Sequence, residues 1–212
     1  MRVGIPMVHG PEDFLQPLVA ILRRAHAGEL AAFLAYEGHW RSLKDPRERD
    51  EVKAIAREEL EHRKCLGLML DDLGYRPAPS REAWFWLIGT AIGGFCRVGG
   101  WLAPMYGAGL LERGNVEEYE EAAGLAMLAG RGDLAPDLLR MAETEWKHER
   151  YFRSRVLERR RGLARLLPLW RSPPPRVAAR RLPPGPRPVA NPGIRSAVSK
   201  EASGRPLRRA GF

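Results

Sequence analysis

Glutamate and histidine stand three residues apart at two places in the chain, and each pair could bind a metal ion. The pairs are Glu59 with His62 and Glu145 with His148. Both fall within long helical patterns, in which the side chains of residues i and i+3 project from one face of the helix. One such pair alone is weak evidence, because this spacing arises by chance in many solvated helices. Two pairs on two helices indicate a metal site.

A second repeated element lies upstream of each pair. Glu29 is followed seven residues later by Tyr36, and Glu112 is followed seven residues later by Tyr119. This separation is about two helical turns, so each glutamate shares a stripe of its helix with its tyrosine. A four-helix di-iron carboxylate bundle requires one Glu from each of two helices and a Glu-x-x-His from each of the other two. The repeat therefore predicts six metal ligands: Glu29, Glu59, His62, Glu112, Glu145 and His148.

The predicted ligands favour iron and oxidation chemistry. Their carboxylates and neutral imidazoles balance the charge of two ferrous ions, so the reduced site is neutral inside an apolar bundle. Carboxylate is a hard ligand and imidazole a borderline one, a mixture that suits iron or manganese better than a closed zinc site. We expect two iron ions (Fe2+/Fe3+) as cofactors and dioxygen as the oxidant.

Four aromatic side chains are candidates for roles beside the ligands. Tyr36 and Tyr119 are the candidate catalytic residues, because their hydroxyls could hydrogen-bond the ligands or carry electrons or protons. The alternative is that both are core tyrosines whose hydroxyls are satisfied elsewhere. His26 and His39 have no counterpart in the second copy, so we expect them at the surface or behind the ligands rather than on a metal.

The choice of Glu112 as a ligand rests on its position. The same helical stretch carries an acidic cluster at 117–121, but only Glu112 stands seven residues before Tyr119 and where the apolar run ends. We expect the 117–121 cluster to be a solvated face.

Four predicted helices must position these residues: 12–43, 46–73, 101–129 and 134–161. Asp45 and Pro46 form a strong helix start, and Gly74 supplies a stop. The connection between the first two helices is so short that they must form an antiparallel hairpin. The predicted fold class is all-α, an antiparallel four-helix bundle with a di-metal site.

The segment from 83 to 111 carries a single charge, at Arg97. The uncharged runs on either side are each shorter than the ~20 residues that span a bilayer. Two interpretations stay open: a buried core helix, or a segment that dips into a membrane interface. We expect Gly93-Gly94 and Gly99-Gly100 to interrupt it.

The charge is concentrated at the C-terminal end of the 212 residues. Positions 171–212 hold ten Lys or Arg against Glu201, a net of +9, which leaves 25 basic and 25 acidic residues before them. We predict a four-helix domain at 1–170 and a disordered, Pro- and Arg-rich tail at 171–212. Cys65 and Cys96 form no disulfide framework, and the first residues lack the apolar run of a signal peptide, so the cytoplasm is the expected compartment.

Several motifs together carry a family resemblance: His26-Ala27-Gly28-Glu29 with Tyr36, the run Glu58-Glu59-Leu60-Glu61-His62, Arg76-Pro77, the Trp- and Gly-rich segment from Trp84, and Glu112 with Tyr119. In their order and spacing they resemble the demethoxyubiquinone hydroxylase family of the ferritin-like superfamily, over about residues 20–155. The resemblance implies the same six residues as iron ligands. It also implies a monooxygenase of ubiquinone biosynthesis that hydroxylates a lipophilic quinol and associates peripherally with the inner face of the cell membrane.

Two departures from the family pattern leave the substrate open. The chain has Glu118-Tyr119 where the family tends to have His-Tyr, and Tyr36-Glu37-Gly38-His39 where the family has a Tyr-Gln-Gly-Gln-like run. One alternative is a ferritin-like or rubrerythrin-like iron or peroxide redox protein. Another is a tRNA-modifying hydroxylase, since an Arg-rich tail neutralises phosphates without sequence preference. The electron donor and a homo-oligomeric state are not specified by the sequence.

Overall fold

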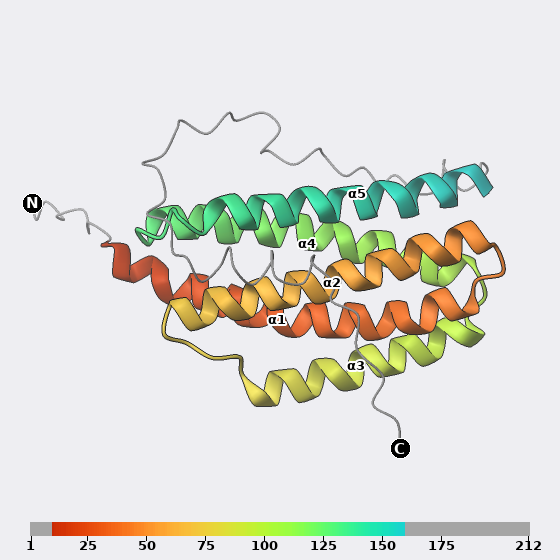
Figure 1. Ribbon diagram of the computed structural model, residues 1–212, viewed down its shortest axis with the longest axis horizontal. Coiled ribbons are helices and arrows are strands. Elements are labelled where there is room, and N and C mark those ends of the chain that lie inside the picture. The colour runs from red at the N-terminus through yellow and green to blue at the C-terminus, as the bar shows by residue number, and fades with distance from the viewer. Residues whose placement is uncertain (1–9, 160–212) are drawn as a thin grey trace, which may run out of the picture. The chain divides into compact units, whose positions relative to one another are not determined.

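The computed structural model describes residues 10–159, and in this range the chain is helical without strands. The all-α prediction is confirmed. Figure 1 shows the helices lying lengthwise alongside one another. Their bounds are α1 (Pro11–Ser42), α2 (Pro46–Asp72), α3 (Pro79–Val98), α4 (Leu102–Leu128) and α5 (Ala135–Arg159).

The α1–α2 hairpin forms as its sequence predicts. The Asp45 carboxylate accepts a hydrogen bond of 2.8 Å from the Arg47 backbone N–H, and Pro46 occupies the first turn of α2, where its missing N–H costs nothing. Gly74 adopts a φ of 79° after the end of α2, a conformation that glycine reaches without a Cβ clash. These signals fix both ends of α2 and therefore its register against α1.

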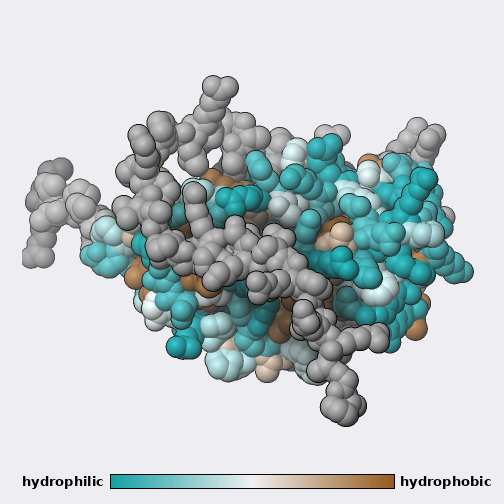
Figure 2. All heavy atoms as spheres, in the orientation of Figure 1, coloured by the Kyte–Doolittle hydropathy of each residue, from teal (hydrophilic) through white to brown (hydrophobic). Residues whose placement is uncertain are grey.

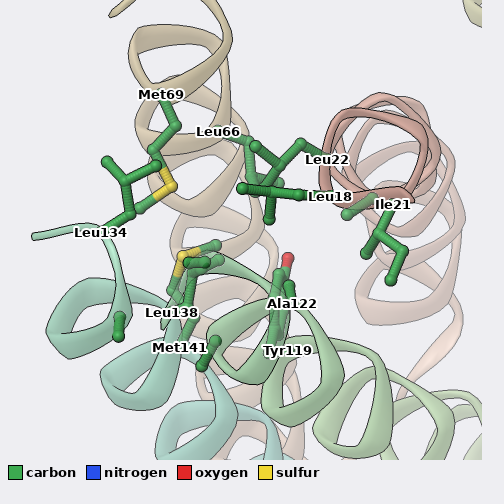
Figure 3. Packing of buried hydrophobic residues seen from close by; sticks show 14 of the residues in the cluster. Leu18, Ile21, Leu22, Leu66, Met69, Tyr119, Ala122, Leu134, Leu138 and Met141 are labelled. Atoms are coloured by element: carbon green, nitrogen blue, oxygen red, sulfur yellow. The ribbon is translucent and has the colours of Figure 1, made fainter. Parts of the chain in front are cut away.

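Two apolar clusters lie at different levels of the bundle formed by α1, α2, α4 and α5. Leu22 of α1 and Leu138 of α5 belong to the first cluster, drawn in Figure 3, and Val52 of α2 and Phe152 of α5 belong to the second. Burying a side chain of this size contributes roughly 1.5–3 kcal/mol. On each of the four helices the predicted ligands lie, along the sequence, between the residues of one cluster and those of the other. Packing on both sides therefore fixes the position of the ligands along the bundle axis.

Helix α3, which lies outside the four predicted helices, corrects one expectation. Gly93-Gly94 does not interrupt it, whereas the predicted break at Gly99-Gly100 is present, with a φ of 71° at Gly100. Gly93 faces α1, because a Cβ on it would lie 2.6 Å from the carbonyl oxygen of Leu34. Close packing of two backbones explains why glycine occurs inside a continuous helix here.

The outer face of α3 is apolar and exposed, so the interpretation of this segment as a buried core helix is wrong for α3. Only Gly89, Gly93 and Cys96 of α3 are buried. Among the coloured residues of Figure 2, hydrophilic side chains dominate and hydrophobic ones form small separate patches. Within residues 10–159, no helix has the length and apolar character needed to cross a membrane. The exposed large apolar residues of α3 are Trp84, Trp86, Leu87, Ile92, Phe95 and Val98.

Two predictions concern residues outside the described range. The domain boundary at 170 and the tail at 171–212 belong to residues that the structure does not describe, and so do positions 160 and 161 of the last predicted helix.

Candidate metal centre

The six predicted ligands come together from four helices in the middle of the bundle. They form two groups, and in each group ligand atoms lie within 4.8 Å of one another. Glu59 and Glu145 belong to both groups, as carboxylates that bridge two ions would. The first group adds Glu29 and His62, and the second adds Glu112 and His148.

Several donor atoms of this cluster are buried and lack a hydrogen-bond partner within the described residues. Buried polar atoms are normally hydrogen-bonded, so a concentration of unpartnered ones needs a ligand to explain it. Acidic oxygens and neutral imidazole nitrogens suit divalent iron or manganese. The residues therefore fit a pair of metal ions. The unpartnered atoms are Glu29 Oε2, both carboxylate oxygens of Glu59, Glu145 Oε1, and Nδ1 of His62 and of His148.

Each histidine directs Nδ1 toward the glutamate of the other Glu-x-x-His. His62 Nδ1 lies 2.7 Å from Glu145 Oε1, and His148 Nδ1 lies 3.3 Å from Glu59 Oε1. Each Glu-x-x-His thus contacts the other across the bundle, and each ligand group contains one complete motif and the glutamate of the other. This arrangement explains why Glu59 and Glu145 are shared.

Glu58 orients His148 from behind. Its Oε2 lies 2.5 Å from Nε2 of His148, and its side chain is 53% exposed. A hydrogen bond on the outer nitrogen fixes the ring with the inner nitrogen free for a metal. The sequence analysis did not identify this residue as a partner of a ligand histidine. The available signal in the sequence was the adjacency of Glu58 to Glu59. Spacing along one helix does not show which residue of a neighbouring helix it meets.

Both predicted tyrosines hydrogen-bond carboxylates of the cluster. The Tyr36 hydroxyl donates to Glu112 Oε1, and the Tyr119 hydroxyl donates to Glu29 Oε1. Burial raises the pKa of both tyrosines well above the ordinary value, so both stay protonated and can donate. Asn115, which the sequence did not single out, donates from Nδ2 to Glu112 at 3.3 Å and to Glu145 at 3.4 Å.

Without a cation, burial makes the charged form of most of these carboxyl groups less favourable. Burial raises the pKa of Glu29, Glu59 and Glu112. Burial acts on Glu145 in the same direction, but its contacts with Glu112 and the two histidines outweigh this and hold its pKa well below the ordinary value. A metal ion that binds here must therefore displace protons.

An apolar cavity of about 460 Å³ borders the cluster between α1, α3 and α4. Glu29, Tyr36 and Tyr119 form part of its wall. Small side chains on α1 leave room for it, and larger apolar ones on α3 and α4 enclose it. The small residues of α1 are Ala25, Gly28, Ala31, Ala32 and Ala35, and the enclosing apolar residues include Phe85, Ile88, Ile92, Phe95, Pro104 and Leu111.

The two other helical histidines are buried, and the expectation of a surface position for them is wrong. His26 Nδ1 lies 2.8 Å from Glu82 Oε1, and Arg63 bonds both Glu82 and the His26 carbonyl, so this group ties α1, α2 and α3 together. His39 is 2% exposed and lines the cavity. Neither lies in the metal-ligand groups.

The acidic cluster on α4 is partly solvated, as expected. Glu117 and Glu121 are exposed, whereas Glu118 accepts a hydrogen bond of 3.0 Å from Arg24 beside the cavity. Glu118 therefore belongs to an ion pair between α1 and α4 and not to the metal cluster.

Comparison with known proteins adds a family to this geometry. The family described as "COQ7: Ubiquinone biosynthesis protein COQ7" matches residues 16–121, half of the chain. The chain belongs to the COQ7 family. Membership supports a role in ubiquinone biosynthesis. The comparison with curated proteins gives no match, and neither does that with solved structures.

The COQ7 match covers only part of the candidate centre. It includes Glu29, Glu59, His62 and Glu112 and ends before the second Glu-x-x-His. Glu145 is associated with the other four through the internal repeat and through the shared ligand groups. Sequence repeat and geometry thus select the α5 residues independently of the family match.

Proposed function

We propose that the chain is a di-iron monooxygenase that hydroxylates a lipophilic, demethoxyubiquinol-type quinol. In this reaction one oxygen atom of dioxygen enters a ring C–H bond as a hydroxyl group, and the other leaves as water. Two electrons and two protons come from an external reductant. Family membership supports the substrate class, and the buried cluster supports the use of metal ions.

The observation that carries the proposal is the contact between cavity and cluster. The cavity is of a size that holds a small organic molecule, its walls are mainly apolar, and Glu29 belongs both to its wall and to the first ligand group. An aromatic ring bound there would lie beside the metal ions without entering the bundle core. Iron oxidation or peroxide consumption requires no such apolar chamber.

The chain's own residues would hold and tune the ions. Glu59 and Glu145, which both ligand groups share, would hold them together with the carboxylates of Glu29 and Glu112 and the imidazoles of His62 and His148. When bound, two ferrous ions supply two electrons for the activation of dioxygen. Tyr36 and Tyr119 keep the carboxylates of Glu112 and Glu29 oriented, because each hydroxyl donates to one of them. The apolar walls exclude water from the reacting ring.

A lipid surface is the proposed source of the substrate, at the inner face of the cell membrane. Ile92, Phe95 and Leu111 line the cavity and are also exposed, so the cavity opens onto the apolar face of α3. An amphipathic helix with Trp, Phe and Leu on its exposed face can lie in the headgroup region of a bilayer. A quinol dissolved in the bilayer could then enter sideways, between α3 and α4.

Vesicle flotation tests the membrane surface with a matched pair of variants. Leu87 of α3 is 52% exposed and Leu68 of α2 is 47% exposed. We expect Leu87→Glu to reduce the fraction that floats with anionic vesicles, because it places a charge in the apolar face, and Leu68→Glu to leave it unchanged. Equal flotation of the two variants would rule out α3 as the membrane contact.

Isotope labelling tests the hydroxylation. The iron-loaded protein is supplied with ¹⁸O₂, a chemical reductant and a short-chain demethoxyubiquinol, and the product is examined by mass spectrometry. The proposal predicts one labelled oxygen atom in the ring. Oxidation of iron or turnover of peroxide without oxygen transfer to the quinol would instead identify an iron or peroxide redox protein. The tRNA alternative depends on the tail at 171–212, outside the described residues, and stays a prediction.

A second pair of variants tests the cavity. An added Cβ meets no atom within 4 Å at Gly107, which lines the cavity, or at Gly114, which lies on α4 outside it. We expect Gly107→Leu to fill the cavity and abolish hydroxylation while iron content is retained. Gly114→Leu should retain both. Full activity of Gly107→Leu would mean that the quinol binds elsewhere.

A further inference from the structure

His39 stands one helical turn beyond Tyr36 in the wall of the apolar cavity. It is 2% exposed, and its Nε2 has no hydrogen-bond partner among residues 10–159. The imidazole stacks on two aromatic rings, with centroid distances of 6.4 Å to Tyr36 and 6.1 Å to Phe152. The ring is therefore held in place without a protein partner for this nitrogen.

The other charged, amide and hydroxyl side chains of the cavity wall are already hydrogen-bonded or, like Glu29, belong to the candidate metal centre. Arg24 pairs with Glu118, Asn115 donates to two metal-site carboxylates, and the two tyrosines donate to Glu112 and Glu29. His39 is thus a wall residue with a buried polar atom left for a ligand. A buried nitrogen without a partner is costly, and a bound molecule that supplies the partner removes that cost.

We propose that His39 determines substrate specificity, because its Nε2 hydrogen-bonds a ring oxygen of the bound molecule. This proposal rests on the quinol-type substrate proposed above. Burial lowers the pKa of His39 to about 4, so the imidazole is neutral near pH 7 and has one donor and one acceptor nitrogen. A neutral imidazole suits a hydroxyl or carbonyl oxygen. It offers no charge to attract an acid.

The position of His39 also predicts which part of the cluster the ring faces. His39 follows Tyr36 by three residues, roughly 4.5 Å along the helix axis, and Tyr36 bonds Glu112. Glu29 lies ten residues before His39, roughly 15 Å along the same axis. A ring anchored at His39 therefore lies nearer to the level of Tyr36, whose hydroxyl donates to Glu112, than to the level of Glu29.

Binding of two matched ring compounds tests the hydrogen bond. The probes are 2-butylhydroquinone and 2-butyl-p-xylene, in which methyl groups replace the hydroxyls, and their dissociation constants are measured by anaerobic equilibrium dialysis against the full-length, iron-loaded chain. The quantity of interest is the ratio of the two constants within each variant, because a general change in the cavity affects both probes alike. Variants are His39→Leu, His39→Met and His39→Gln, with Ile92→Ala as an apolar control in the same wall.

The expected result is a loss of discrimination that depends on the polar atom. His39→Leu and His39→Met should lower the preference for the hydroquinone by about tenfold, the effect of one lost hydrogen bond. His39→Gln should recover most of it, and Ile92→Ala should leave the ratio unchanged. Unchanged ratios in both apolar variants, or an equal loss in His39→Gln, would overturn the role of His39. Failure of the wild-type chain to bind hydroquinone at all would instead count against the quinol-type substrate.

Discussion

The Tyr119 hydroxyl donates a hydrogen bond to Glu29, which lies 90 positions earlier in the chain. Tyr36 makes the corresponding bond to Glu112. Each tyrosine therefore supports the glutamate of the other copy of the repeat and not the glutamate on its own helix. Because α1 and α4 run antiparallel, the equal spacing of seven residues on both helices makes the two contacts equivalent.

Removing either hydroxyl should weaken metal binding. In Tyr119→Phe the Glu29 carboxylate loses a donor in a buried site, and loss of such an outer contact typically costs about 10- to 100-fold in metal affinity. Competition with a chelator measures the change. Tyr75→Phe is the control, because the Tyr75 hydroxyl accepts from Gln16 on an exposed part of the bundle. Wild-type affinity in both Tyr119→Phe and Tyr36→Phe would show that these bonds do not orient the ligands.

The metal-free protein should lose stability as the pH rises above the ordinary histidine value of 6.5. Burial raises the pKa of Glu29, Glu59 and Glu112, so the folded chain retains protons that the unfolded chain releases above about pH 4.5. Unfolding then releases protons, and stability falls as pH increases. His39, whose pKa is lowered to about 4, acts in the opposite direction, but only below 6.5.

Thermal unfolding between pH 6.5 and about 8.5 measures this effect. We expect the Tm of the metal-free chain to fall across the window. The iron-loaded chain should show a smaller slope, since the metal has displaced the protons. A metal-free Tm that stays level or rises over this range would contradict protonation of the buried carboxyls.

Adjacent glycines in α3 should respond to alanine in opposite ways. A Cβ on Gly93 would lie 2.6 Å from the Leu34 carbonyl oxygen, whereas a Cβ on Gly94 meets no atom within 4 Å. Gly93→Ala should destabilise the fold by about 1–3 kcal/mol through overpacking against α1. Gly94→Ala should stabilise it by roughly 0.5–1 kcal/mol, because alanine is the better helix former. Chemical denaturation compares the two, and equal effects would show that α3 does not depend on this close contact.

The helical framework could be predicted because its signals are local. Asp45, Pro46 and Gly74 define the ends of α2, and the repeated Glu and Tyr residues mark the helix faces that meet in the middle of the bundle. The structure brings all six predicted ligands together, while their binding of metal stays a prediction. Two equal spacings on antiparallel helices carry enough information to align four helices.

Features that depend on packing between helices could not be predicted. Gly93-Gly94 predicts a break that α3 does not have, since a helical glycine is unfavourable until a neighbouring backbone occupies the space that it leaves. The burial of His39 follows from the contact of α1 with Phe152 of α5, which no spacing within α1 indicates. The bond between Glu58 and His148 likewise joins two helices whose rotation is set by the core.

Iron content is the most direct test of the di-metal centre. Glu112 is fully buried in the second ligand group, whereas Glu118, six residues further along the same helix, pairs with Arg24. The account predicts about two iron ions per wild-type chain, a clear loss in Glu112→Ala, and nearly unchanged content in Glu118→Ala. Retention of two ions by Glu112→Ala, together with their loss in Glu118→Ala, would contradict the assignment of Glu112 and with it the six-ligand centre.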